Sequence, residues 1–399
     1  MGISYVEYTL DELGFVGRGK SKHRPRNDQV LFGGKYPFIQ TGDVKAANLY
    51  ITQFSETYNE VGLAQSKLWE KGTLLITIAA NIAETAVLGM DACFPDSIVG
   101  FIPDESKVNA FFIKYYIDFI KQEMQQISQG TTQDNLSLDK LRTFKFKVPA
   151  KSVVDEITNV LKSYDDLIEN NNRRIEILET IAQKLYQEWF IHYRFPNHEQ
   201  AQWQDTEQGK IPVGWEVKAS SEVIEFAPRM RLPKEGLKPF VSMPNVSTSS
   251  MVIDEIEWRE GNSGTKFQNG DTLLARITPC LQNGKTAFVQ FLDEEHPIGL
   301  GSTEFIVMRS KTLTPEFVYC LARSAPFRGH AINSMAGADG RQRVKNDCFD
   351  AYYLAVPPQK LLDDFSAIAE PLFKQVFALS KKNKNLKRQR DLLLPKLIE

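Results

Sequence analysis

The sequence has few cysteines and no transmembrane signal. Its four cysteines, Cys93, Cys280, Cys320 and Cys348, are far apart and form no Cys-X-X-Cys pair. This spacing argues against a zinc site and against a disulfide framework, and it suits a reducing cytosol. The chain also lacks an apolar run of about 18 residues and a basic-then-apolar signal pattern. We therefore expect a cytoplasmic protein with no membrane partner.

The sequence has no excess of charge of one sign. Its 48 lysines and arginines nearly balance 50 aspartates and glutamates, for a formal net charge of −2. If nucleic acid is a partner, the positive charge that binds it must be local. A length of 399 residues with 42% hydrophobic and 25% charged residues fits a folded chain of two or more domains.

Several enzyme motifs are absent or incomplete. The segment Asn283–Thr286 (NGKT) ends like a phosphate-binding loop, but Pro279 stands where that loop needs its first glycine. The segment Gly299–Ser302 is too short for a dinucleotide fingerprint. Pro95–Asp96 followed by Glu105–Lys107 resembles the short carboxylate and lysine pattern of Mg²⁺-dependent nucleases. An Mg²⁺-dependent DNA endonuclease with its own recognition domains is therefore one alternative, and no metal site is assigned.

Two long stretches, Val153–Phe190 and Leu361–Ile398, carry apolar residues at alternating steps of three and four and lie 208 positions apart. The seam of the first stretch comprises Val154, Ile157, Leu161, Tyr164, Ile168, Ile175, Leu178, Ala182, Leu185 and Trp189. The seam of the second comprises Leu362, Phe365, Ala369, Leu372, Val376, Leu379, Leu386 and Leu393. Asn171 interrupts the first seam, and Asn383 and Arg390 interrupt the second. The spacing predicts two heptad helices.

Each of these helices would span roughly 50–55 Å at 1.5 Å per residue, and the two can pair antiparallel as a coiled coil. Asn171 and Asn383 are candidates for setting the register of that pair. Pro371 should kink the second helix or delay its regular start, and Pro395 should end it raggedly. The alternatives are long core helices of ordinary domains, or a coiled-coil scaffold with no role in nucleic-acid binding.

The segments before each long helix also repeat, so the fold class is α+β with two tandem domains. A strand, a buried helix and a final strand are predicted at Lys71–Ile78, Val108–Ile120 and Phe144–Val148, and again at Asn269–Ile277, Thr314–Arg323 and Asp350–Val356. Phe195–Gly214 reads as a linker. The predicted domains are residues 1–150, a helix and linker at 151–198, residues 199–357, and a C-terminal helix at 358–399.

Candidate DNA-binding residues lie in polar and basic loops of both halves. The loop Gly17–Asn27 contains five cations and no acid, which suits phosphate contacts. Gly130–Leu136 and Gly337–Val344 precede the last strand of each half, and Thr77–Thr85 and Arg276–Thr286 follow the repeated strand. Arginine favours guanine edges, and glutamine or asparagine favours adenine. The candidates are Arg18, Lys20, Lys22, Arg24, Arg26, Thr131, Thr132, Gln133, Asn135, Arg276, Gln282, Asn283, Lys285, Arg341, Gln342, Arg343 and Lys345. Ordinary surface turns are the alternative for each loop.

The chain resembles the specificity subunit of a Type I restriction-modification enzyme over its whole length. The motifs that carry the resemblance are Ala182–Pro196 (AQKLYQEWFIHYRFP), Lys210–Val217 (KIPVGWEV), Asn269–Ile277 (NGDTLLARI), Gly130–Leu136 (GTTQDNL), Gly340–Val344 (GRQRV) and Asp391–Leu397 (DLLLPKL). The resemblance implies a non-catalytic subunit that grips double-stranded DNA with one target-recognition domain per half-site. It also implies that the helix pair is a spacer.

The resemblance further implies the partners. Two modification subunits, which methylate adenine with S-adenosylmethionine, would dock on the spacer and domains. Restriction subunits would supply ATP- and Mg²⁺-dependent translocation and cleavage. No cofactor is expected on this chain itself.

Overall fold

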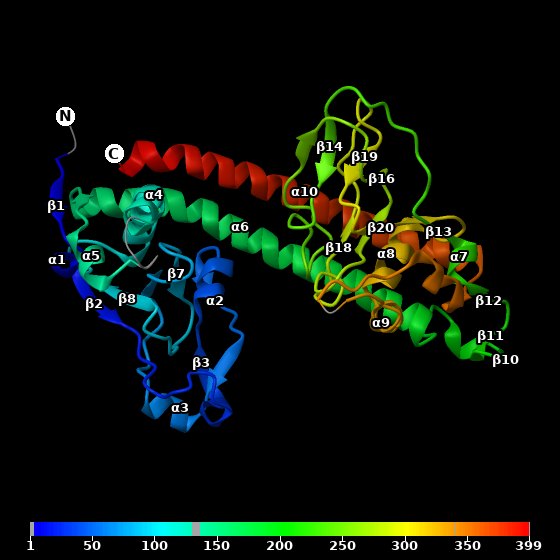
Figure 1. Cartoon of the computed structure of the whole chain (residues 1–399), viewed down its shortest axis with the longest axis horizontal. Helices are drawn as coiled ribbons and strands as arrows, with labels where there is room; N and C mark the ends of the chain where they lie inside the picture. The colour runs from blue at the N-terminus through cyan, green and yellow to red at the C-terminus, as the bar shows by residue number, and fades with distance from the viewer. Residues whose placement is uncertain (1–3, 130–135, 339, 399) are drawn as a thin grey trace. The chain divides into compact units, whose positions relative to one another are not determined.

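The computed structural model describes residues 4–129, 136–338 and 340–398 of the chain. It divides into two compact units, and both boundaries between them fall inside the two longest helices, α6 (Lys151–Tyr186) and α10 (Gln359–Ile398). Unit 1 consists of Met1–Asn170 and Asn383–Glu399, and unit 2 consists of Asn171–Lys382. Each unit therefore contains part of both helices (Figure 1).

Unit 1 contains short strands around one main sheet. Its strands are β1 (Val6–Tyr8), β2 (Gly14–Arg18), β3 (Phe32–Phe38), β4 (Tyr50–Ile51), β5 (Glu56–Tyr58), β6 (Leu74–Thr77), β7 (Thr85–Leu88), β8 (Ile98–Pro103) and β9 (Phe146–Val148). Its helices besides α6 and α10 are α1 (Leu10–Leu13), η1 (Gln29–Leu31), α2 (Thr41–Ala46), α3 (Glu60–Ala64), α4 (Ala110–Gln129) and α5 (Leu138–Thr143). The main sheet has the order β2-β8-β6-β7-β4, and β1 pairs antiparallel with β9.

Strand β6 lies at the centre of this sheet and is buried on both faces. Leu74 and Ile76 belong to the apolar cluster that α4 covers, whereas Leu75 belongs to a second cluster with Trp69 and Phe94. A run of consecutive apolar residues is what a strand buried on both faces requires. The prediction of a strand in Lys71–Ile78 and of a buried helix near Val108–Ile120 is confirmed.

Unit 2 repeats this arrangement with additional strands. Its strands are β10 (Trp203–Thr206), β11 (Gly209–Pro212), β12 (Glu216–Ala219), β13 (Ile224–Phe226), β14 (Lys238–Val241), β15 (Glu257–Arg259), β16 (Thr265–Phe267), β17 (Thr272–Ala275), β18 (Thr286–Phe288), β19 (Gly299–Gly301), β20 (Phe305–Ser310) and β21 (Tyr353–Val356). Its helices besides α6 and α10 are η2 (Gln187–Ile191), η3 (His198–Gln200), α7 (Ser220–Val223), α8 (Pro315–Arg323), α9 (Ala325–Asn333) and η4 (Asn346–Ala351).

The sheets of unit 2 show which elements correspond between the units. One sheet has the order β13-β20-β17-β18 and the other β15-β14-β19-β16, and β12 pairs antiparallel with β21. Strand β17 lies between β20 and β18, as β6 lies between β8 and β7. The predicted strands in Asn269–Ile277 and Asp350–Val356, and the helix at Thr314–Arg323, are confirmed.

Two features of unit 2 differ from the prediction or from unit 1. The predicted linker Phe195–Gly214 contains the hairpin β10–β11, because Trp203 and Ile211 carry a short strand pattern that the polar composition masks. The position of α4 is taken by two helices, α8 and α9, with Ser324 in extended conformation between them. Pro326 explains this break, since proline is unfavourable inside a helix and favourable in its first turn.

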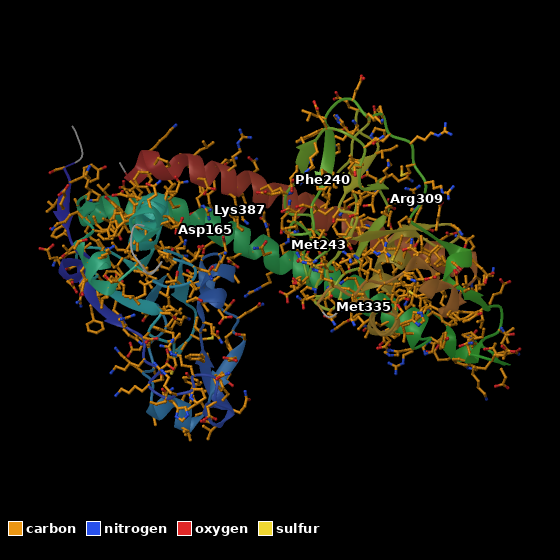
Figure 2. All side chains as sticks on the ribbon, viewed as in Figure 1. Asp165, Phe240, Met243, Arg309, Met335 and Lys387 are labelled. Carbon is orange, nitrogen blue, oxygen red and sulfur yellow. The ribbon has the colours of Figure 1, made fainter. Side chains whose placement is uncertain are left out.

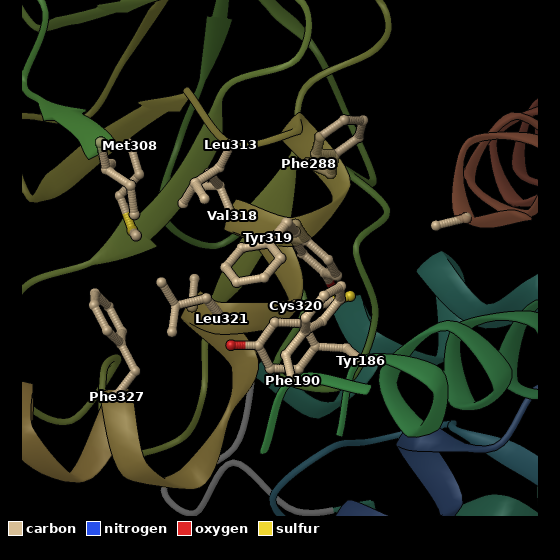
Figure 3. Close-up of a cluster of buried hydrophobic side chains, with 14 of the residues drawn as sticks. Tyr186, Phe190, Phe288, Met308, Leu313, Val318, Tyr319, Cys320, Leu321 and Phe327 are labelled. Carbon is tan, nitrogen blue, oxygen red and sulfur yellow. The ribbon is translucent and has the colours of Figure 1, made fainter. Parts of the chain in front are cut away.

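The long helices form where the heptads predict them. In unit 2, the α6 residues Ile175 and Ala182 share a buried core with seam residues of α10, among them Phe365 and Val376. The rings of Tyr186 and Phe190 pack against the residues of α8 in the same core (Figure 3), with Phe190 4.8 Å from Phe317 between ring centroids.

In unit 1, the seam residues Val154, Ile157 and Leu161 share a core with Ile398 of α10. The polar breaks Asn171 and Asn383 are both buried, each within its own unit. The predicted helices at Val153–Phe190 and Leu361–Ile398 are therefore present, with burial on the predicted face.

The predictions for the two prolines of α10 are wrong in part. The helix runs from Gln359 to Ile398, so Pro371 does not delay its start and Pro395 does not end it. Pro371 is exposed, and its missing N–H costs about 3 kcal/mol. The buried neighbours Ala369 and Phe373 fix the helix on both sides of it, and each large apolar side chain buried contributes about 1.5–3 kcal/mol.

Candidate nucleic-acid interface

The basic loop Gly17–Asn27 follows strand β2 in unit 1, and its cations are exposed. Its backbone is anchored, since the amides of Lys22 and His23 donate to the side-chain oxygen of Gln65. Arg24 donates to the carbonyl oxygens of Ser21 and His23, both at 2.7 Å. The loop therefore holds its positive charges on a fixed backbone, as phosphate contacts require.

The remaining cations of this loop divide into two groups. Arg18 donates to the carbonyl oxygen of Asp96 at 2.9 Å, and Arg26 forms an ion pair with the Asp96 carboxylate at 2.8 Å. The side chains of Lys20 and Lys22 are exposed. Both lysines are consistent with the predicted role in phosphate binding, which stays a prediction.

An aromatic and cationic surface next to this loop was not predicted. The Lys67 ammonium lies 3.6 Å from the Trp69 ring centroid and 4.9 Å from that of Phe15, which is 54% exposed. Burial lowers the pKa of Lys67, and the nearby charge of Lys20 lowers it further. Phe15 and Lys67 are 52 positions apart in the sequence, so no local pattern could have predicted that their side chains lie together.

Each unit brings two candidate loops together through the same backbone hydrogen bond. In unit 1 the Leu136 amide donates to the carbonyl oxygen of Ile78 at 2.9 Å, and in unit 2 the Val344 amide donates to that of Arg276 at 2.9 Å. Leu136 and Val344 are 208 positions apart and both are buried. The candidates Thr131, Thr132, Gln133 and Asn135 belong to the unit 1 loop and lie outside the described residues.

In unit 2, several predicted DNA-binding side chains bind the protein itself. The Arg276 guanidinium donates to the carbonyl oxygen of Val344, and the Lys285 ammonium donates to that of Met243 at 2.8 Å (Met243 is labelled in Figure 2). Arg343 forms a bidentate pair with Glu304 at 2.7–3.0 Å, which lowers the pKa of that carboxyl. These three cations hold the loops in place in this structure, and their contact with DNA stays untested.

The other unit 2 candidates form the outer surface of the loops. Gln282, Asn283, Arg341 and Lys345 are exposed, and Gln342 is half-buried while its carbonyl oxygen accepts from the Thr278 amide at 3.1 Å. Exposed amide and guanidinium groups on a backbone held by internal hydrogen bonds are the donors and acceptors that reading of base edges requires.

The short nuclease-like pattern does not assemble into a metal site in the structure. The Asp96 carboxylate pairs with Arg26, and Lys107 contacts Asp104 at 3.4 Å and donates to the carbonyl oxygen of Glu12 at 2.9 Å. Within residues 4–129, 136–338 and 340–398, no group of three or more histidine, cysteine, aspartate or glutamate side chains is placed to hold a metal ion.

Known proteins are similar to this chain in sequence and in fold. Residues 3–180 match the Type I restriction modification DNA specificity domain. Over 409 aligned residues, the chain is 27% identical to the Type I restriction enzyme MjaIX specificity subunit of Methanocaldococcus jannaschii, covering 98% of this chain and 91% of that protein. Over most of its length, the chain is therefore similar to Type I restriction enzyme specificity subunits.

Two further matches extend this similarity, one in sequence and one in fold. The Type I restriction enzyme EcoEI specificity subunit of Escherichia coli is 30% identical over 162 residues, which cover 39% of this chain and 27% of that protein. The crystal structure of the Type-I restriction-modification system S subunit from M. genitalium aligns with a TM-score of 0.59 at 15% identity, covering 100% of this chain and 97% of that one. The second likeness concerns the fold alone.

Among its described residues, this chain has no helix that is both long enough and apolar enough to span a membrane. The predicted resemblance to Type I specificity subunits is confirmed by the family model and the curated relatives. The role of this chain in target recognition stays a prediction. The individual DNA-binding residues, the partners and the cytoplasmic location stay predictions.

Proposed function

We propose that this specificity subunit binds a bipartite double-stranded DNA target, with one target-recognition domain for each half-site. The observation that carries the proposal is the repeated loop pairing, in which the amides of Leu136 and Val344 bind equivalent carbonyls of Ile78 and Arg276. The backbone arrangement is shared, whereas the side chains around it differ between the units. Two domains that share one backbone arrangement but carry different side chains for contacting bases suit a target whose two halves differ in sequence.

We further propose that α6 and α10 pair as an antiparallel coiled coil that sets the distance between the half-sites. Supporting contacts occur within each unit: the start of α6 shares a core with the end of α10 in unit 1, and the end of α6 shares one with the start of α10 in unit 2. A spacer of roughly 50–55 Å exceeds one DNA turn of about 34 Å, so both domains can reach one face of a duplex.

The partners in this proposal are two modification subunits that dock on the spacer and the domains and methylate adenine. These subunits would bind S-adenosylmethionine, and restriction subunits would use ATP and Mg²⁺. The target adenine must leave the base stack to reach a methyltransferase pocket, so the recognition domains must hold a distorted duplex as well as read it. Linking two weak readers in one chain raises the effective concentration of the second reader after the first has bound.

The spacer can be tested by removing one heptad from both helices at equivalent positions, residues 170–176 and 378–384. The seven residues correspond to roughly 10 Å of helix, so the gap between half-sites should shorten by about three base pairs while the half-sites stay the same. Mapping of methylated adenines in cells that express the complete system measures both quantities. Deletion in α6 alone is the control and should abolish methylation, because it shifts one heptad seam against the other. An unchanged gap in the double deletion would disprove the spacer.

The base-reading loop is tested separately by Arg341→Ala in the complex with the modification subunits. We expect a changed recognised base or a loss of affinity at one half-site, because Arg341 is exposed on a fixed loop. If the recognised sequence and the affinity stay the same, this loop does not read bases. The purified chain with Mg²⁺ and DNA should cleave nothing, and cleavage without partners would favour the endonuclease alternative.

A further inference from the structure

In unit 2, two arginines of the α8–α9 region bind the backbone of the loop that follows strand β17. Arg323 donates to the carbonyl oxygens of Gly284 at 3.0 Å and Thr248 at 3.1 Å. Arg328 donates to the carbonyl oxygens of Leu281 at 3.3 Å and Gln282 at 3.0 Å. The exposed candidate Gln282 therefore has its own carbonyl oxygen held by a helix side chain.

The loop is shaped to receive these arginines. Gly284 has φ +84°, and a Cβ at this position would lie 3.2 Å from a terminal nitrogen of Arg328 and 3.1 Å from the carbonyl oxygen of Thr248. A side chain there would be strained and would press on the arginine. Burial lowers the pKa of Arg328, with a further contribution from the charge of Arg323, so the two cations are held close together at a cost in free energy.

Unit 1 has a corresponding contact made by different side chains. Helix α4 occupies the position of α8 and α9, and its Lys121 forms an ion pair with Glu84 at 2.7 Å. The Gln125 amide donates to the carbonyl oxygen of Ile82 at 3.0 Å. Ile82 and Glu84 lie in the loop between β6 and β7, as Leu281 and Gly284 lie in the loop between β17 and β18. A helix thus grips the equivalent loop in both units.

The contact between the helix and this loop is suited to holding the loop backbone in one position. Discrimination between base pairs depends on hydrogen bonds worth about 1–3 kcal/mol each, and these weaken steeply when donor and acceptor are displaced or misaligned. An exposed loop tip keeps its side chains in place only if its backbone is fixed. In unit 2 the loop tip with Gln282 and Asn283 is exposed, while the carbonyls of the same loop are bound by the helix arginines.

We propose that Arg323 and Arg328 in unit 2, and Lys121 and Gln125 in unit 1, are positioning residues that set the sequence specificity of the half-site bound by their own unit. This inference rests on the proposed function of bipartite DNA recognition. None of the four side chains needs to touch a base. Arg323, Arg328 and Gln125 act through backbone carbonyls of the loop between the central strand and the next. Lys121 acts through the Glu84 side chain of that loop.

The test uses the specificity subunit assembled with its modification subunits and a library of targets with each half-site randomised in turn. Arg328→Ala should reduce discrimination among bases at one half-site by about five- to a hundred-fold, which is the loss expected for one well-placed base contact. Discrimination at the other half-site should stay the same. Gln125→Ala should give the reciprocal result, with relaxed specificity at the half-site that Arg328→Ala leaves intact.

Two controls separate positioning from general damage. Arg328→Lys keeps a cationic donor for the two carbonyls and should restore most of the discrimination. Arg194→Ala removes an arginine of unit 2 that is exposed and pairs with Glu188, and it should leave both half-sites unchanged. The thermal unfolding midpoint of each variant shows whether the fold is intact.

The outcomes distinguish this inference from the proposed function. Equal relaxation at both half-sites, or unchanged discrimination in both Arg328→Ala and Gln125→Ala, would overturn the positioning role. If the unmodified complex shows no sequence-selective binding or methylation, the proposed function itself fails.

Discussion

Removal of Arg390 should destabilise unit 1 strongly, because it leaves a buried carboxylate without its cation. Asp165 of α6, labelled in Figure 2, is fully buried and pairs with Arg390 of α10, whose side chain is 18% exposed. The hydroxyl of Tyr115 in α4 donates to the same carboxylate at 2.6 Å, and burial raises the pKa of that hydroxyl. In Arg390→Ala, this hydroxyl would still donate to Asp165, but the carboxylate would have lost its cation.

The magnitude follows from the burial. Removing one partner of a buried ion pair costs about 3–5 kcal/mol, since the remaining charge stays desolvated. Neutralising the remaining charge should recover most of this loss, because a neutral amide costs less to bury and its oxygen still accepts from Tyr115. We therefore expect Arg390→Ala to lower the free energy of unfolding of unit 1 by about 3–5 kcal/mol, and the double variant Asp165→Asn with Arg390→Ala to be clearly more stable than Arg390→Ala.

Amide hydrogen exchange read by mass spectrometry measures the two units separately. Peptides from α4 report on unit 1 and peptides from α8 on unit 2. A loss of about 3–5 kcal/mol accelerates exchange in the most protected amides of α4 by roughly a hundred- to several-thousand-fold, while α8 should be unchanged. A change below about 1 kcal/mol in Arg390→Ala would refute the reasoning, and so would a double variant that is no more stable than the single one.

Three further predictions concern single residues. Arg309→Ala leaves the buried Asp271 carboxylate without its bidentate partner at 2.6–2.8 Å and should destabilise unit 2 by about 3–5 kcal/mol, measured by hydrogen exchange in α8. Burial raises the pKa of Glu179 above its usual 4.5. The stability that the protonated Glu179 contributes is therefore fully present below pH 4.5 and is lost as the pH rises through the raised pKa. Glu179→Gln should remove this part of the pH dependence of the thermal midpoint. Lys22→Ala should weaken binding of all DNA sequences by the assembled complex and reduce the slope of log affinity against log salt by about one, whereas Lys360→Ala, outside the basic loop, should not.

The sequence predicted the elements whose burial pattern is local. Consecutive apolar residues at Lys71–Ile78 and Asn269–Ile277 predicted β6 and β17, and the heptads predicted α6 and α10. Each of these signals lies within the element itself. The continuity of α10 through Pro371 was not predictable in this way, because it depends on packing of the flanking residues against other parts of unit 2.

The positions of the candidate loops were predictable, but the use of their charges was not. Repeated placement ahead of equivalent strands indicated which loops meet in each unit. The partners of Arg276, Lys285 and Arg328 are backbone carbonyls 42 to 68 positions away, and any residue type can supply a carbonyl. Composition therefore cannot tell an arginine that binds a phosphate from one that binds the loop beside it.

The two copies of the helix repeat differ in charge at two pairs of positions that the heptad pattern makes equivalent. The positions 208 residues from Asp165 and Arg390 are Phe373 and Ala182, both buried in the apolar core of unit 2. The ion pair of unit 1 is thus not required by the geometry of the repeat, since the same positions pack without charge in unit 2. Burying an ion pair costs desolvation free energy, whereas burying apolar residues does not. What such a pair provides is specificity, because any other register or partner would leave one of the two charges buried alone. The asymmetry therefore distinguishes the two ends of otherwise similar helices, so that an exchange of the two halves would bury Asp165 or Arg390 among apolar side chains.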